Sequence, residues 1–81
     1  MFIDERNPKY RQEMIEYLED RGYCVDTGGH HTRAEIINDI LPIAVVKKEK
    51  KYRMMGNRTC AAAAASGGGL KTREELYQYI K

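Results

Sequence analysis

Hydrophobic positions recur with a helical period near the start of the chain. Asn7 can cap the free backbone amides of a helix, and Pro8 fits the first helical position. The hydrophobic residues that follow are spaced so that they share one face of a helix: Tyr10, Met14, Tyr17 and Leu18. Gly22 can adopt the left-handed conformation that commonly ends a helix. The pattern therefore predicts a helix over residues 8–21.

Two further helices are predicted from a shared start signal. Thr32 and Glu35 form a T-x-x-E capping box, and so do Thr72 and Glu75. The first box opens a helix over residues 32–41, which Pro42 should stop. Its hydrophobic stripe is Ile36, Ile37, Ile40 and Leu41. The second box opens a helix over residues 73–80, with a stripe of Leu76, Tyr77, Tyr79 and Ile80.

The strands are predicted between these helices. Residues 23–25 form one short strand, and residues 43–46 and 51–55 form a β-hairpin around a lysine-rich turn. The period of two leaves open which face of the first hairpin strand meets the core. The two choices are Ile43 with Val45, or Ala44 with Val46.

Residues 60–66 contain five consecutive alanines and predict a fourth short helix, which Gly67–Gly69 would end. So short a helix must be packed to be stable. The competing interpretation makes residues 61–69 a linker or an engineered scar.

The predicted fold is α+β: a small two- or three-stranded antiparallel sheet with a basic hairpin, packed by three or four short helices. Its 81 residues indicate a single small α+β domain, 1–81, with a modest core. This size argues against enzymes with deep sites and favours a homodimer. A mean hydropathy of −0.68 and the lack of a long apolar run exclude a membrane span. A charged N-terminal segment and only two cysteines predict a cytoplasmic protein.

Positive charge is concentrated in the middle of the chain. Residues 32–58 hold seven Lys or Arg and three Asp or Glu, a net charge of +4. Residues 1–31 hold four basic and seven acidic residues, a net charge of −3. This asymmetry indicates a surface that meets a partner. The predicted partner-binding residues of the hairpin are Lys47, Lys48, Lys50, Lys51, Tyr52, Arg53 and Arg58.

Three interpretations of this hairpin compete. It can be a solvated edge whose lysines prevent aggregation. It can be the wing of a winged-helix-like DNA-binding protein, although helix 32–41 lacks the side chains that read bases. It can be a protein-docking surface, because interfaces favour Tyr, Arg and Met. We expect a protein partner, with nucleic acid as the alternative.

A zinc site is a further hypothesis. The chain holds four thiol or imidazole groups, the ligand set of tetrahedral zinc: Cys24, His30, His31 and Cys60. Their spacing lacks the C-x2-C and H-x3-H pairs of zinc fingers. In the alternative interpretation the cysteines are small core residues and the histidines lie in solvent.

No motif indicates catalysis, because neither Cys24 nor Cys60 comes with an oxyanion donor or an orienting group. The sequence therefore predicts a non-enzymatic binding protein that docks a macromolecular partner through residues 47–58. A small regulator or inhibitor of mobile-element or phage type fits this description. The alternatives are a DNA-binding protein and a zinc-stabilised structural module.

Overall fold

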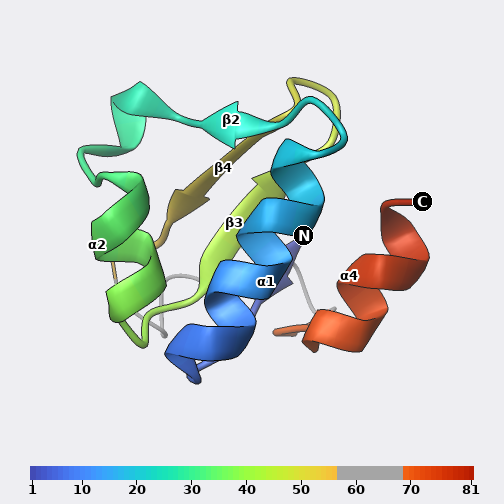
Figure 1. Cartoon of the computed structure of the whole chain (residues 1–81), viewed down its shortest axis with the longest axis horizontal. Helices are drawn as coiled ribbons and strands as arrows, with labels where there is room; N and C mark the ends of the chain where they lie inside the picture. Colours follow the sequence, from blue (N-terminus) through green and yellow to red (C-terminus); the bar gives the residue numbers. More distant parts are fainter. Residues whose placement is uncertain (57–68) are drawn as a thin grey trace.

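The computed structural model of this protein describes residues 1–56 and 69–81 (Figure 1). Along the chain its elements are β1 (Phe2–Ile3), α1 (Pro8–Glu19), β2 (Cys24–Val25), a 3₁₀ turn (Thr27–Gly29), α2 (Arg33–Asn38), β3 (Ile43–Val46), β4 (Lys51–Met54) and α4 (Arg73–Tyr79). This mixture confirms the predicted α+β class. The predicted helix over residues 60–66 and the competing linker lie outside the described residues.

The strands of the described part form a four-stranded sheet in the order β1-β3-β4-β2. β3 pairs antiparallel with β1 and with β4, whereas β2 pairs parallel with β4. The sheet therefore has one strand more than predicted and is not wholly antiparallel. The additional strand is β1, and its two residues are too few to show a period of two.

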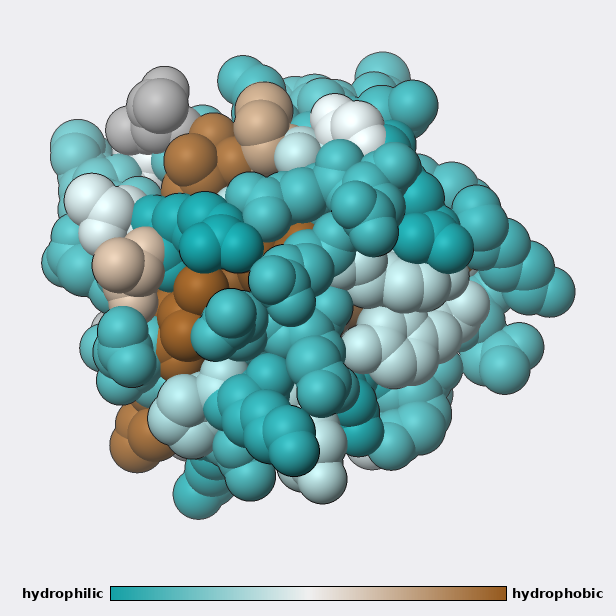
Figure 2. Space-filling view, viewed as in Figure 1, coloured by the Kyte–Doolittle hydropathy of each residue, from teal (hydrophilic) through white to brown (hydrophobic). Residues whose placement is uncertain are grey.

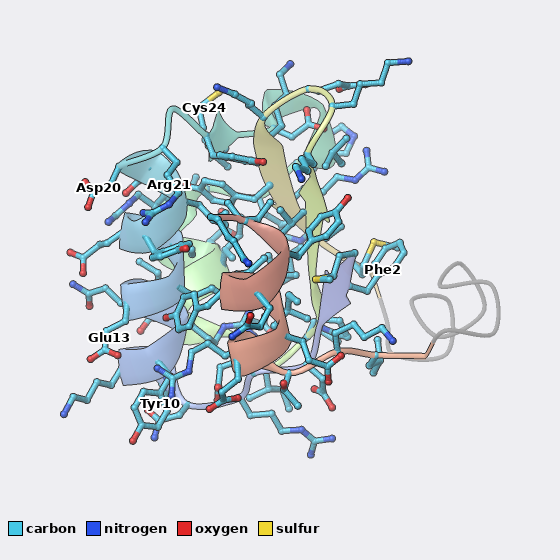
Figure 3. All side chains as sticks on the ribbon, turned by 90° about the vertical axis from the view of Figure 1, so that its right-hand side faces the viewer. Phe2, Tyr10, Glu13, Asp20, Arg21 and Cys24 are labelled. Carbon is cyan, nitrogen blue, oxygen red and sulfur yellow. The ribbon has the colours of Figure 1, made fainter. Side chains whose placement is uncertain are left out.

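The register of the sheet decides which face of β3 meets the core. Ile43 is paired with Ile3 on one side and Met54 on the other, and Val45 is paired with Tyr52. All five side chains belong to the buried core cluster. The Ile43 and Val45 alternative is therefore the one observed. Phe2 alternates to the other face and lies on the side of the sheet away from α1 (Figure 3).

Helix α1 begins as predicted, because the Asn7 side chain accepts a hydrogen bond of 2.9 Å from the Lys9 backbone amide. Gly22 has a φ of +89° just beyond its end. The buried stripe differs from the predicted one, since Tyr10 is 37% exposed. The stripe follows the spacing i, i+3, i+4, i+7 and consists of Arg11, Met14, Ile15 and Leu18.

The two predicted capping boxes are both present, at Thr32 with Glu35 and at Thr72 with Glu75. Helix α2 nevertheless ends at Asn38, short of the predicted residue 41. The Asp39 carboxylate accepts hydrogen bonds from the next two backbone amides, at 2.6 and 3.1 Å. This local turn competes with a further helical turn and leaves Ile40 55% exposed.

The three labelled helices lie on one side of the sheet, with α1 between α2 and α4 (Figure 1). Lys71 joins α4 to the sheet, because its amide donates to Phe2 O at 2.8 Å and its carbonyl accepts from Asp4 N at 2.9 Å. The Tyr17 hydroxyl donates to the Ile80 carbonyl and links α1 to the end of α4. No helix in the described ranges is long and apolar enough to cross a membrane.

Candidate binding site

The basic turn, residues 47–50, joins β3 to β4 and confirms the predicted hairpin. The backbone amide of Lys50 donates to Lys47 O at 3.3 Å and closes the turn. Lys47, Lys48 and Lys50 are all exposed. Lys50 has a φ of +54°, in the left-handed region that a residue with a Cβ rarely adopts. The central sheet thus presents three lysines on a short, closed turn.

These charges are not compensated within the described part of the chain. Among residues 1–56 and 69–81, none of Lys47, Lys48 and Lys50 forms an ion pair. Other basic side chains do find carboxylates; Arg33 Nε lies 3.0 Å from Glu19 Oε2, for example. Glu49 is the one acidic residue of the turn itself. The basic turn therefore keeps a net positive charge available to a partner.

A pocket of about 400 Å³ opens beside the basic turn. We name it the turn pocket; the described residues that line it are Arg21, Tyr23, Lys47, Lys50, Tyr79, Ile80 and Lys81. They come from the end of α1, the approach to β2, the turn, and the end of α4.

On the face in Figure 2, hydrophobic residues show mainly on the left, over α2, whereas the right side near α4 is hydrophilic.

The two turn lysines of the pocket lie close to neighbouring segments. Lys47 Nζ lies 4.7 Å from the centroid of the Tyr79 ring and donates to Tyr79 O at 3.4 Å. The end of the Lys50 side chain lies near Gly22, because a methyl group built on Gly22 would lie 3.9 Å from Lys50 Nζ. The Lys47 ammonium is therefore positioned by an aromatic ring and a backbone carbonyl, and no carboxylate of the described residues pairs with either lysine.

Arg21 supplies a third cation. It lies just beyond the C-terminal end of α1, where Figure 3 labels it next to the C-cap residue Asp20. Its guanidinium carbon stacks 3.5 Å from the centroid of the Tyr17 ring, and Nη1 donates to Tyr17 O at 3.0 Å. A cation that binds the last carbonyls of a helix is favourably placed, because the helix dipole is negative at that end.

The two tyrosines of the turn pocket differ in exposure. Tyr23 is almost buried, and burial, with a smaller contribution from Tyr79, raises the pKa of its hydroxyl above the ordinary value. Tyr79 is 41% exposed. The pocket therefore combines a protonated hydroxyl with an aromatic surface that a ligand can reach.

The remaining predicted partner-binding residues are placed differently. Tyr52 points into the core, where it is fully buried, and its hydroxyl donates to Glu19 at 3.2 Å. This placement removes Tyr52 from the side chains that a partner can contact. Arg53 is exposed but lies 3.5 Å from Asp26, and Lys51 is half-buried on β4. Arg58 lies outside the described residues.

The residues of the zinc hypothesis are only partly described. Cys24 is exposed on β2, His30 is exposed after the 3₁₀ turn, and His31 is half-buried. No three His, Cys, Asp or Glu residues within ranges 1–56 and 69–81 are grouped so that they could hold a metal ion. Cys60 lies outside these ranges, so the four-ligand set stays a prediction.

Sequence reasoning found the lysines of the basic turn but missed Arg21, Tyr23 and Tyr79. The turn lysines form a contiguous run, whereas the other residues reach the pocket from distant segments. Arg21 carried a weak signal, because a basic residue at the end of a predicted helix is well placed for the helix dipole. Nothing local connected it to Tyr79.

The fold and this surface define a small α+β domain with a basic, tyrosine-containing pocket at its hairpin turn. Comparisons with protein-family models, with curated proteins and with solved structures found no match for the chain. The functional argument therefore rests on the geometry and charge described above.

Proposed function

We propose that this chain is a non-enzymatic binding protein that docks a macromolecular partner through the basic turn. The observation that carries this proposal is the exposure of Lys47, Lys48 and Lys50 without ion-pair partners in the described residues. A regulator or inhibitor of the kind encoded by phages and mobile elements fits a small domain with one such surface.

The partner that this surface suits is a protein with an acidic face. Charges on a closed turn steer an oppositely charged partner and fix its orientation, and they act more on the association rate than on the final affinity. The turn joins β3 and β4, which are the two inner strands of the sheet. Docking therefore needs little reordering of the backbone, and ordering is one of the costs of association.

Helix α2 gives the winged-helix alternative no specific support. It spans only Arg33–Asn38, and Ile36 and Ile37 are buried against the core. Arg33 is paired with Glu19, and the side-chain amide of Asn38 donates to Ala34 O at 2.9 Å. These polar side chains are engaged within the domain and do not form a free base-reading row.

Reversing the charges of the turn is expected to abolish capture of the partner. A Lys47→Glu, Lys48→Glu double variant should retain less than about a tenth of the partner that the wild-type protein captures from host lysate, because close opposite-charge contacts contribute about 1.5 kcal/mol or more. Its melting temperature should barely change, because exposed substitutions have small effects on stability. Quantitative mass spectrometry of the captured proteins measures the first effect and thermal unfolding the second.

An Arg6→Glu, Lys9→Glu double variant is the matched control. Both residues are exposed near the start of α1, and the net charge changes by the same amount. This control should capture the partner normally. Equal loss in both variants would refute a specific role for the turn, and loss of all capture after nuclease treatment would identify nucleic acid as the partner.

A further inference from the structure

The turn pocket places Arg21 beside two of the lysines, Lys47 and Lys50, that the docking proposal uses. Arg21 reaches it from beyond the end of α1, and Lys47 and Lys50 reach it from the basic turn; none of the described residues that line it has an acidic side chain. A pocket surrounded by three cations in a medium of lowered dielectric favours an anion of more than one negative charge.

Among residues 1–56 and 69–81, no carboxylate forms an ion pair with any of these cations. Arg21 stacks on Tyr17 and Lys47 stacks on Tyr79, whereas the Lys50 ammonium only lies near Gly22. Lys50 additionally keeps a left-handed backbone conformation that glycine would adopt without cost. Strain of this kind points to a side chain that is retained for what it does. The side chains of Arg21 and Lys47 are thus preorganised for a ligand.

The size and chemistry of the pocket select the ligand class. Its volume of about 400 Å³ lies in the range of small-molecule sites, roughly 300–1,000 Å³. A single carboxylate from an acidic peptide would leave most of this space to water. A nucleotide unit brings both a phosphate for the cations and an aromatic base for the exposed ring of Tyr79.

We propose that the turn pocket binds one nucleotide unit of a single-stranded nucleic acid. The phosphate is held by Arg21, Lys47 and Lys50, and the base lies against Tyr79. A single strand is the appropriate source, because its bases are free to leave the stack and lie on an aromatic side chain. This site goes beyond the proposed function, since a protein can dock on the turn without any nucleotide in the pocket.

The test measures binding of a short single-stranded oligothymidylate to the full chain at low ionic strength, by fluorescence anisotropy. An abasic oligomer of the same length carries the same phosphates without the bases. The wild-type protein should bind the abasic oligomer about tenfold more weakly, because the abasic oligomer lacks the base that would stack on the aromatic side chain. A Tyr79→Leu variant should bind both oligomers alike.

The charge arm uses Lys50→Gly, with Lys48→Gln as the matched control. Both variants lose one lysine of the same turn, but Lys48 does not line the pocket. Lys50→Gly should weaken oligothymidylate binding severalfold while raising the melting temperature by a few degrees, because it relieves the left-handed conformation. Lys48→Gln should change the affinity for oligothymidylate less than about twofold, since the Lys48 ammonium is exposed to solvent and lies outside the pocket.

Three results would overturn the nucleotide site. The first is that Lys48→Gln weakens oligothymidylate binding as much as Lys50→Gly does. The second is that the wild-type protein binds the abasic oligomer as tightly as oligothymidylate. The third is that a polyglutamate peptide displaces bound oligothymidylate as effectively as unlabelled oligothymidylate does. Each can occur while the wild-type protein still captures its protein partner, so failure of this site is distinguishable from failure of the docking proposal.

Discussion

Replacing Arg11 with methionine is expected to lower the free energy of unfolding by about 3–5 kcal/mol. Arg11 is fully buried on the core face of α1. Domains of this kind are stable by roughly 5–15 kcal/mol in total. The variant should therefore be partly or largely unfolded at physiological temperature.

The size of this effect follows from what the guanidinium holds together. Arg11 Nε donates to Ile36 O at 2.7 Å, and Nη1 donates to Glu5 O at 2.5 Å and to Leu41 O at 2.9 Å. The side chain thus joins α1 to the segment that follows β1, to α2 and to the approach to β3. Methionine fills similar space but leaves these carbonyls without a donor, and buried unsatisfied carbonyls are costly.

Urea denaturation of the two proteins measures the difference. Arg33→Met is the control, because it removes an arginine whose partner Glu19 is accessible to solvent and should cost no more than about 1 kcal/mol. Arg11→Lys keeps the charge but loses the planar fork and should fall between the two. A loss for Arg11→Met no greater than that for Arg33→Met would contradict this role of Arg11.

A second large effect is expected in alkaline solution. Burial raises the pKa of Tyr52 to about 12, with further contributions from the negative charge of Glu19 and from the hydrogen bond that Tyr52 donates to it. The unfolded chain releases this proton near pH 10. Between pH 10 and 12 the unfolded state therefore gains stability relative to the folded state, which keeps the proton.

The stability that the protonated Tyr52 contributes is fully present below pH 10 and is lost as the pH rises towards 12. The loss amounts to about 2–3 kcal/mol, since each pKa unit corresponds to about 1.4 kcal/mol. Tyr52→Phe removes the titrating group, so the unfolding free energy of this variant should fall less steeply over the same pH interval. Denaturant unfolding at a series of pH values measures both slopes. Identical slopes would contradict the assignment.

Much of the fold could be predicted because helix starts are local. Asn7 with Pro8, and the two capping boxes, involve residues no more than three positions apart. The predicted end of α2 is wrong because the hydrophobic stripe continues past Asp39, whereas the Asp39 side chain forms a turn that ends the helix. The predicted buried stripe of α1 is wrong because it omits Arg11. Arg11 can be buried only because it donates hydrogen bonds to carbonyls of distant segments, which the local sequence does not reveal.

The candidate site divides in the same way. A run of lysines between two hydrophobic segments shows the basic turn directly in the sequence. Side chains of a strand point alternately to its two faces, so one residue of each neighbouring pair must face the core. Only the pairing of Tyr52 with Val45 of β3 shows that Tyr52 is the inward-facing residue. The turn pocket could not be predicted, because Arg21 and Tyr79 meet Lys47 only after α1 and α4 have packed on the sheet.

Amine labelling of the captured complex tests the central claim, that the basic turn is the docking surface, most directly. Reductive methylation followed by mass spectrometry compares each lysine in the free protein and in the complex. We expect Lys47, Lys48 and Lys50 to be protected in the complex, while Lys9, exposed at the start of α1, reacts equally in both. Turn lysines that react as fast in the complex as in the free protein would contradict the account.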